Sequence, residues 1–315
     1  MGFESLLGNE RLRENLSRSI ERGRISHFYL ICGPEGSGKH TLAQLLSAAI
    51  LCDSKEKPCL SCNSCRKVTT ANHPDVITVV DPEHKNVAVK IVRQIRDDVF
   101  IRPNEGSHKI YIFPQELGVE GQNALLKILE EPPAYGVFML LADNPEKLLP
   151  TIRSRCTELQ LTALPEALAR RELSRLFPQA DAQQLAAAIA RSGGYLGQAK
   201  ALLEEGITED PQTEGFVQSF AKRDPIALLQ VLVPMEKWKR DQFIPVLEQW
   251  VQTLHGALMC RSGISAISPA ARQLSTARSS GELMSAITCL QKAITYAQGN
   301  VSVAAICSYL EWALR

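Results

Sequence analysis

The chain has 315 residues, of which 45% are hydrophobic and 22% charged, and its formal net charge is +1. This length suffices for two or three domains with cores of their own, and the composition is that of an ordinary soluble globular protein. A net charge so close to zero excludes a global field that attracts DNA or membranes. Any DNA contact must therefore come from a local patch or through partner subunits.

The N-terminus and the hydropathy pattern predict a cytoplasmic protein without membrane contact. Residues 1–5 lack the basic and apolar regions of a signal peptide. No uninterrupted apolar run approaches the roughly 20 residues that a membrane-spanning helix needs.

Short apolar runs alternate with amphipathic segments over the first 160 residues. The runs that predict strands are residues 28–32, 76–80, 110–113, 137–142 and 156–161. The segments with helical spacing are residues 7–20, 41–51 and 122–131. Buried parallel strands have this continuous apolar character and are separated by helices. The pattern therefore predicts an α/β domain with a five-stranded parallel sheet.

Helical spacing dominates after residue 162, which predicts an all-α remainder. Residues 206–214 have the composition of a linker between a small helical domain and a helical bundle. The other interruptions lie at Pro178, at residues 192–194, at Pro225, at Pro234 and at residues 262–269.

A glycine-rich segment between the first strand and the next helix predicts a phosphate-binding loop. Its candidate residues are Gly33, Gly36, Gly38, Lys39, His40 and Thr41. The glycines let backbone N–H groups face phosphates, and Lys39 would reach the terminal phosphates. His40 stands where a Ser or Thr hydroxyl normally binds Mg²⁺, and Thr41 points about 100° away on a helix. The residues leave binding of ATP or ADP open and count against hydrolysis.

The third predicted strand lacks the acidic pair that would hold Mg²⁺ and polarise water. Pro114 and Gln115 follow it, and neither is a general base or an anionic ligand. Glu116 is one residue further along, where a lone carboxylate is usually a solvated helix-entry residue.

Four of the nine cysteines are clustered, and they predict a metal site. They are Cys52, Cys59, Cys62 and Cys65. Four thiolates form a closed tetrahedral zinc site, which is structural rather than catalytic. Four unligated thiols and an iron–sulfur cluster are the alternatives. The other five cysteines have apolar neighbours and are interpreted as small buried hydrophobes.

Arg155 follows the fourth predicted strand in the segment Thr151–Cys156. By itself an arginine at this position is usually a solvated side chain. A rigidly held guanidinium could instead stabilise the γ-phosphate of a neighbouring subunit during phosphoryl transfer.

The segment from Asn123 to Pro133 resembles the NALLKxLEEPP signature of bacterial clamp-loader ATPases. The phosphate loop, the four cysteines and Ser154-Arg155-Cys156 are three further markers in the expected order. Over roughly residues 3–205 the chain thus resembles the DNA polymerase III clamp-loader family, which comprises gamma/tau and delta-prime subunits.

The resemblance implies three parts. These are an AAA+ core over residues 1–162 with a zinc insertion at about 52–65, a helical lid over 163–207 and a helical collar over 208–315. The collar would join five subunits in a ring. In such rings gamma/tau hydrolyses ATP and delta opens the sliding clamp, which is loaded on primer-template DNA. Arg155 would complete the ATP site of a neighbouring gamma/tau subunit.

The chain departs from the active family members where they contact ATP, magnesium or water. His40 and Pro114-Gln115 are two such positions, and Gly197 stands where the lid's nucleotide-sensing arginine is expected. Because Arg155 is retained, the pattern favours the delta-prime type without ATPase activity of its own, and we expect no tau-type tail after residue 315.

Two alternatives stay open. One is an active gamma/tau-type ATPase. The other is a solitary zinc-bearing phosphotransferase, which needs a catalytic base near the loop; the sequence does not place His27, His40 or His73 there.

Overall fold

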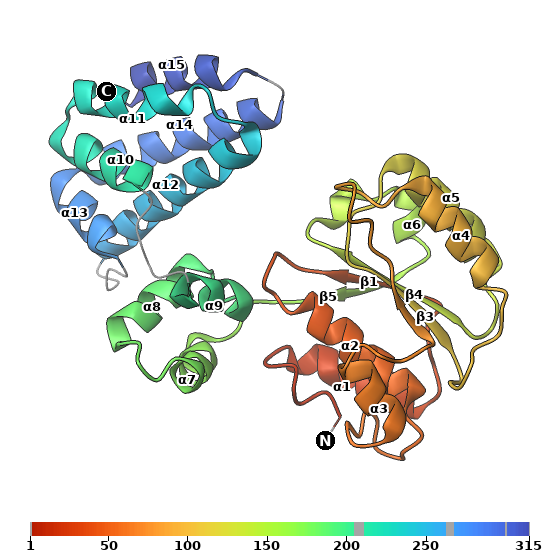
Figure 1. Cartoon of the computed structure of the whole chain (residues 1–315). Coiled ribbons are helices and arrows are strands. Elements are labelled where there is room, and N and C mark those ends of the chain that lie inside the picture. The colour runs from red at the N-terminus through yellow and green to blue at the C-terminus, as the bar shows by residue number, and fades with distance from the viewer. Residues whose placement is uncertain (1, 205–210, 263–267, 300, 315) are drawn as a thin grey trace. The chain divides into compact units, whose positions relative to one another are not determined.

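Five strands in the first half of the chain form one parallel sheet in the computed structural model (Figure 1). They are β1 (Phe28–Cys32), β2 (Val76–Thr78), β3 (Lys109–Phe113), β4 (Gly136–Ala142) and β5 (Thr157–Gln160). Their order is β2-β3-β4-β1-β5, so β1 lies between β4 and β5. The sheet confirms the predicted fold class. The structure describes residues 2–204, 211–262, 268–299 and 301–314.

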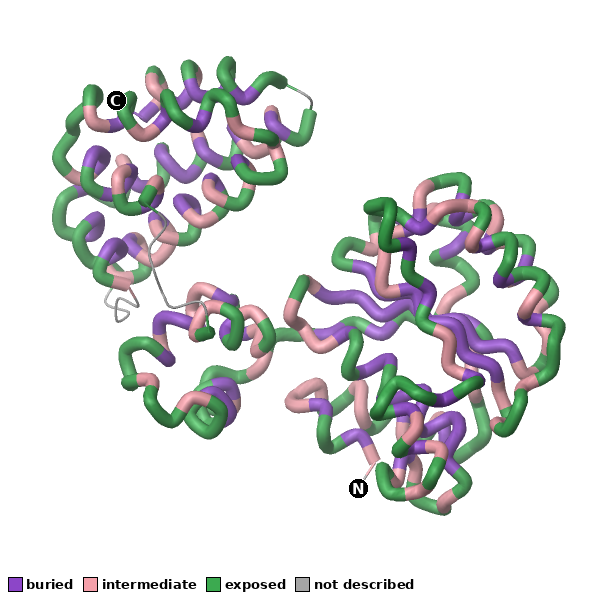
Figure 2. Tube along the Cα trace, viewed as in Figure 1, coloured by how far each residue is buried: buried purple, intermediate pink, exposed green. Residues whose placement is uncertain are grey.

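Helices cover both faces of the sheet. Successive side chains of a strand point to opposite faces, so a strand buried on both faces contributes to two separate apolar cores. Tyr29 and Ile31 belong to one apolar core, and Phe28, Leu30 and Cys32 belong to the other. The first core is completed by α1 (Glu10–Glu21), α2 (Lys39–Leu51) and α3 (Asn63–Thr69). The second is completed by α4 (Val89–Asp98), α5 (Val119–Glu130) and α6 (Pro150–Arg153). The central strands β3, β4 and β1 are accordingly buried throughout, whereas the edge strands β2 and β5 are partly exposed (Figure 2).

After β5, the described residues form helices joined by loops, and a short 3₁₀ turn, Pro145–Lys147, lies between β4 and α6. The helices are α7 (Glu166–Leu176), α8 (Ala182–Arg191), α9 (Leu196–Glu204), α10 (Pro211–Lys222), α11 (Pro225–Met235), α12 (Arg240–Arg261), α13 (Pro269–Ala277), α14 (Ser280–Gln298) and α15 (Val303–Ala313). Trp250 of α12 is fully buried and stacks on Phe216 of α10, with ring centroids 4.3 Å apart. No helix among the described residues is long and apolar enough to cross a membrane.

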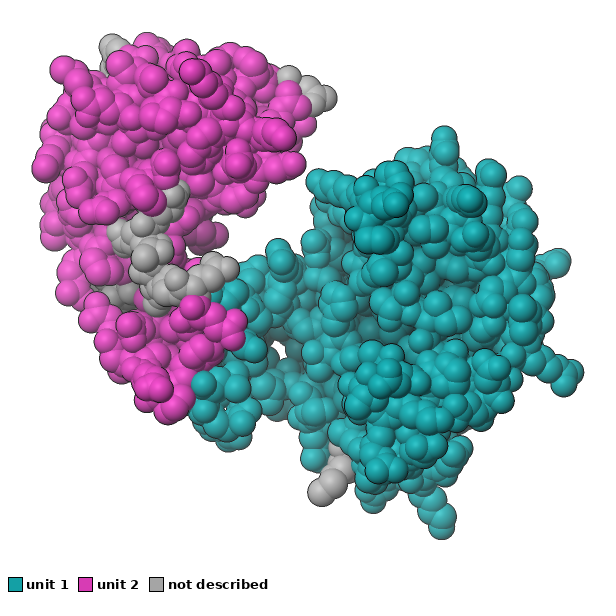
Figure 3. Space-filling view, in the orientation of Figure 1, with its two compact units in different colours: residues 1–176, 192–201 teal, residues 177–191, 202–315 magenta. Residues whose placement is uncertain are grey.

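Two compact units make up the chain (Figure 3). Unit 1 comprises residues 1–176 and 192–201, and unit 2 comprises residues 177–191 and 202–315. Unit 1 contains the sheet, and unit 2 contains the helices α10 to α15 around one apolar core. The division into three domains at residues 162 and 207 stays a prediction.

Proline positions explain where the helical pattern is interrupted. Pro225 is in the first turn of α11, where its missing N–H costs nothing, and the Asp224 side chain accepts hydrogen bonds from two N–H groups of that turn. Pro234 lies in the last turn of the same helix. The predicted linker 206–214 ends too late, because α10 begins at Pro211; residues 205–210 lie outside the described part.

The five scattered cysteines are only partly as predicted. Cys32 and Cys307 are buried, whereas Cys156, Cys260 and Cys289 are half-buried. Apolar neighbours in sequence indicate a helix or strand, but they do not determine which of its faces a side chain occupies.

Candidate nucleotide site and metal centre

The predicted phosphate loop lies at the carboxyl end of β1 and leads directly into α2. Gly36 and Gly38 have φ angles of 72° and 95°, which only glycine adopts without strain. Gly33 begins the loop, and its N–H donates to the Ala142 carbonyl at 3.1 Å. Glycine is thus required at two of the predicted loop positions, whereas phosphate binding by the loop stays a prediction.

A cavity of about 630 Å³ in unit 1 adjoins this loop. Its lining combines polar loop residues with leucine side chains, among them Leu6, Leu7 and Leu164. The predicted residues Gly36, Gly38, Lys39, His40 and Thr41 all line it. In volume and lining the cavity suits a ligand of nucleotide size.

The lysine of the loop bonds within the protein. Lys39 is buried, and its Nζ donates to the Gly33 carbonyl, the Pro34 carbonyl and Asp143 Oδ1 at 2.7, 2.9 and 2.7 Å. Asp143 directly follows β4, the neighbour of β1, so its side chain reaches the loop from the adjacent strand end. The sequence analysis missed Asp143, because no motif marks a single aspartate after a strand.

The positions where active family members hold magnesium are occupied here by residues in other settings. His40 and Thr41 are exposed in the first turn of α2. Gln115 fastens the segment before α4: its Oε1 accepts from the Asp81 N–H at 2.8 Å, and its Nε2 donates to the carbonyls of Asp81, His84 and Lys85. A neutral amide fits this role because it both donates and accepts, whereas a carboxylate only accepts.

The loop also makes a close contact with the start of α9. The Gly197 N–H donates to the Gly36 carbonyl at 2.9 Å. A Cβ atom on Gly197 would lie 2.7 Å from both Cα and O of Gly36. No side chain fits here without a backbone shift, so an arginine could not occupy this position in the present geometry.

Arg155 lies at the opposite end of the sheet from the loop. It follows α6 and precedes β5, beside a hollow formed with residues 26–28, Leu129, Glu130 and Pro132. Its guanidinium donates to the Thr151 carbonyl at 3.0 Å and lies 4.0 Å from Glu130. Residues 26 and 27 directly precede β1, which begins at Phe28. Its five residues span about 16 Å, so Arg155 cannot reach the loop of its own chain.

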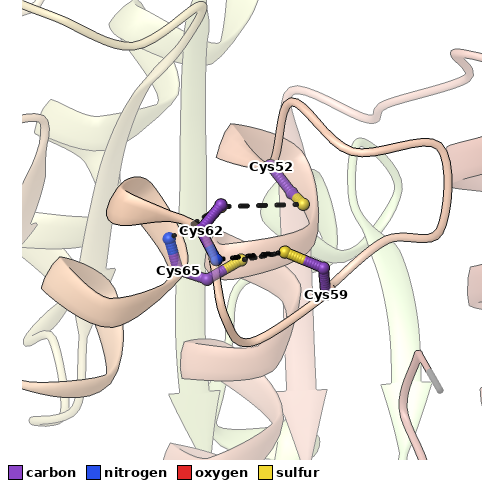
Figure 4. Close-up of side chains that lie close together, drawn as sticks. All are labelled: Cys52, Cys59, Cys62 and Cys65. Carbon is purple, nitrogen blue, oxygen red and sulfur yellow. Dashed lines mark hydrogen bonds between the residues drawn. The ribbon is translucent and has the colours of Figure 1, made fainter.

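The four clustered cysteines converge in the structure (Figure 4). All four Sγ atoms lie within 4.8 Å of one another. The Cys59–Cys65 and Cys62–Cys52 sulfur atoms are 3.9 and 4.0 Å apart. Zn–S bonds of about 2.3 Å in a tetrahedron place sulfur atoms about 3.8 Å apart. The cluster therefore fits a single tetrahedral metal ion, and it is too narrow for an iron–sulfur cluster among its thiolates.

The surroundings of the sulfur atoms also suit a metal ion. The Cys62 and Cys65 N–H groups donate to the sulfurs of Cys59 and Cys62 at 3.3 and 3.4 Å. Hydrogen bonds from the Ser54 side chain and from Ser61 lower the pKa of the Cys59 thiol to about 5. Burial raises the pKa of Cys65, and a bound cation would oppose that effect.

Cys62→Ser is expected to release the metal and destabilise unit 1. Cys52 and Cys65 are part of the apolar core beneath α2, so losing the ion disturbs a packed layer. Elemental analysis should show loss of the bound metal, and the melting temperature of unit 1 should fall by roughly 10 °C. The unfolding of unit 2 should not change. Wild-type protein without metal would contradict the assignment.

Of the three histidines that the sequence leaves unplaced, only His40 lines the cavity. The ring of His27 is bonded to the Gly136 carbonyl at 3.1 Å. His73 is buried, and its Nδ1 accepts from the Asp75 N–H.

The model of the family described as "DNA polymerase III, delta subunit" matches residues 8–165, half of the chain. The match covers the phosphate loop, the cysteine cluster and Arg155. The chain belongs to this family. It is thus a member of the AAA+ family of clamp-loader subunits, as the sequence resemblance predicts.

The relatives belong to the same group of subunits. The chain is 37% identical to the DNA polymerase III subunit delta' of Pseudomonas aeruginosa over 60% of its own length and 59% of the relative's. It is 35% identical to subunit gamma/tau of Mycobacterium tuberculosis over 56% of its own length and 31% of the relative's. The chain thus spans less than two thirds of these relatives. A gamma subunit-related protein of Thermotoga maritima aligns with 96% of the chain and 99% of its own at 20% identity and a TM-score of 0.41.

Proposed function

We propose that this protein is a clamp-loader subunit of the delta-prime type, which has no ATPase activity of its own and acts on a neighbour. It would assemble with gamma/tau and delta subunits and help to load the sliding clamp on primer-template DNA. Arg155 would complete the ATP site of an adjacent gamma/tau subunit, and the four cysteines would hold a structural zinc ion.

The position of Arg155 carries the proposal. Arg155 is exposed at the amino end of the sheet, and the length of β1, about 16 Å, separates that end from the chain's own phosphate loop. The guanidinium donates a hydrogen bond to the Thr151 carbonyl, and Ile152 of α6 is buried in the apolar core. Both contacts fix the turn that carries Arg155. A fixed, exposed arginine that cannot serve its own loop is suited to a γ-phosphate supplied by another subunit.

The phosphate loop supports the other half of the proposal. Among the described residues, the carboxylates that line the cavity are Glu35 and Asp143, and Asp143 is bonded to Lys39. His40 offers no hydroxyl for Mg²⁺, and Gln115 is engaged elsewhere. Hydrolysis needs both a placed metal ion and a placed water, and no group of this loop supplies them.

An exposed apolar face on unit 2 supports assembly with other subunits. Ile226, Leu229 and Val233 recur along one side of α11, and all three are exposed. Trp312 of α15 is 75% exposed. Exposed apolar stripes of this kind are typical of surfaces that bind other proteins.

An active gamma/tau-type ATPase is the second candidate, because the gamma/tau relatives match the same part of the chain. Steady-state hydrolysis of Mg²⁺–ATP by the isolated chain separates the two. We expect no turnover above background, and mixing with purified gamma/tau and delta should give a stoichiometric complex on size exclusion. Clear magnesium-dependent turnover would favour the second candidate.

A further inference from the structure

The cavity beside the phosphate loop is large enough for a nucleotide, so lack of space does not exclude one. Its volume of about 630 Å³ lies in the ordinary range for small-molecule sites. Leucine side chains from three segments offer an apolar surface for a base. A barrier to phosphate binding would therefore have to lie in the polar part of the cavity.

The Lys39 ammonium has no donor left for a phosphate. It carries three N–H donors. Two donate to the carbonyls of Gly33 and Pro34, and the third donates to Asp143 Oδ1 at 2.7 Å. The side chain is only 9% exposed, so bulk water does not compete for these donors. A phosphate could bind Lys39 only by displacing one of the three partners.

Asp143 is the partner that resembles a phosphate. It is an anion, and its distance from Nζ is that of a charge-assisted bond to a carboxylate or phosphate oxygen. It projects from the end of β4 at the same sheet edge as the loop, because β1 and β4 pair in parallel with Cys32 opposite Ala142. Asp143 is 59% exposed and lines the cavity, so its negative charge also faces an entering phosphate.

One backbone N–H of the loop is also engaged within the protein. The Ser37 N–H donates to the Pro34 carbonyl at 3.1 Å, within the loop. In a phosphate-binding loop such N–H groups face the phosphates instead. The contact between Gly36 and Gly197 holds the tip of the loop against α9.

We propose that Asp143 is an internal counterion that keeps nucleotide phosphates out of this loop by occupying Lys39. It determines specificity in two ways. It engages the ammonium that would bind a phosphate, and it adds a like charge beside the phosphate position. The inference deepens the proposed function and rests on its claim that this loop is not catalytic, but it concerns binding rather than turnover.

The test is equilibrium binding of N-methylanthraniloyl-ADP to the isolated full-length chain, with and without Mg²⁺. Asp143→Ala should tighten binding about tenfold or more relative to the wild type, because Lys39 is freed and a repulsive charge is lost. Asp143→Asn should act in the same direction and keeps the side-chain volume. Lys39→Ala combined with Asp143→Ala should remove most of the gain.

Glu35→Gln is the matched control. It removes the same charge from the same cavity without touching Lys39, and binding should change less than about threefold. Equal tightening by Glu35→Gln and Asp143→Ala would overturn the inference, since net charge alone would then explain the effect. Unchanged binding in both folded Asp143 variants would also overturn it.

Two further outcomes separate this inference from the proposed function. Weaker Mg²⁺-dependent binding in Asp143→Asn would mean that Asp143 is a magnesium ligand, and the inference would be wrong. Asp143→Ala could also bind the nucleotide tightly and hydrolyse ATP. The inference would then hold, but the claim of the proposed function that this loop is not catalytic would be wrong.

Discussion

Arg155→Ala is expected to leave this protein folded and to abolish ATP turnover at the one site that it serves in the assembled complex. Arg155 is exposed, and its guanidinium donates to the Thr151 carbonyl and lies 4.0 Å from Glu130, so its loss should cost little stability. In trans it would stabilise the charge that develops on the γ-phosphate. Loss of such an arginine reduces turnover about 10³-fold or more at the affected site.

Steady-state hydrolysis by the reconstituted, DNA-stimulated complex measures this effect. The total rate should fall by the share of one ATP site. Arg155→Lys should restore little, because an ammonium cannot replace the planar fork of a guanidinium. Arg153→Ala, an exposed neighbour on α6, should leave the rate unchanged. Equal rates for the wild type and Arg155→Ala in a stoichiometric complex would contradict a role in trans.

Trp250→Ala is expected to unfold unit 2 at much lower temperature and thereby prevent assembly. Trp250 is fully buried, stacks on Phe216 and lies in the middle of the apolar core of α10 to α15. Truncating a buried aromatic side chain costs about 3–5 kcal/mol, which lowers the melting temperature by on the order of 10 °C. Calorimetry and size exclusion with gamma/tau and delta measure the two consequences.

Trp312→Ala is the matched control in the same unit. Trp312 is 75% exposed, so its loss should leave the melting temperature within about 1 °C of the wild type. It should weaken assembly if the exposed apolar face is an interface. Normal assembly by a melted Trp250→Ala protein would refute the role of unit 2 in joining the subunits.

The centre of the sheet could be predicted from sequence because β1, β3 and β4 are buried on both faces. Residues 28–32 form β1 as predicted. β3 and β4 each begin one residue earlier than the predicted strands 110–113 and 137–142. β2 ends at Thr78 instead of residue 80. Runs of apolar residues indicate burial, but pairing partners set the length of a strand, and these lie far away in sequence.

The helices α3 and α4 were missed for different reasons. α3 has only seven residues and begins with a hydrogen bond from the Cys65 N–H to the Cys62 sulfur, so the cysteine cluster determines it more than periodicity does. α4 has a clear amphipathic pattern that follows a polar loop at residues 81–88. That loop is fixed by Gln115, a contact over 34 positions that no local pattern reveals.

In the candidate site, too, contacts between residues close in sequence could be predicted and contacts between distant residues could not. The loop glycines and the four cysteines are close in sequence, so motif spacing predicted that they would converge. Asp143 is far from Lys39 in sequence, and Glu130 is far from Arg155. The two pairs come close only in the fold. Their roles depend on which strands and helices become neighbours, and one sequence does not determine that.

A single comparison tests most directly whether this chain lacks a working site of its own and serves the next subunit. Lys39→Ala and Arg155→Ala are placed separately in otherwise wild-type complexes, and DNA-stimulated ATP hydrolysis is measured at saturating ATP. The account predicts a wild-type rate with Lys39→Ala and a reduced rate with Arg155→Ala. A reduced rate with Lys39→Ala together with a normal rate for Arg155→Ala would contradict it.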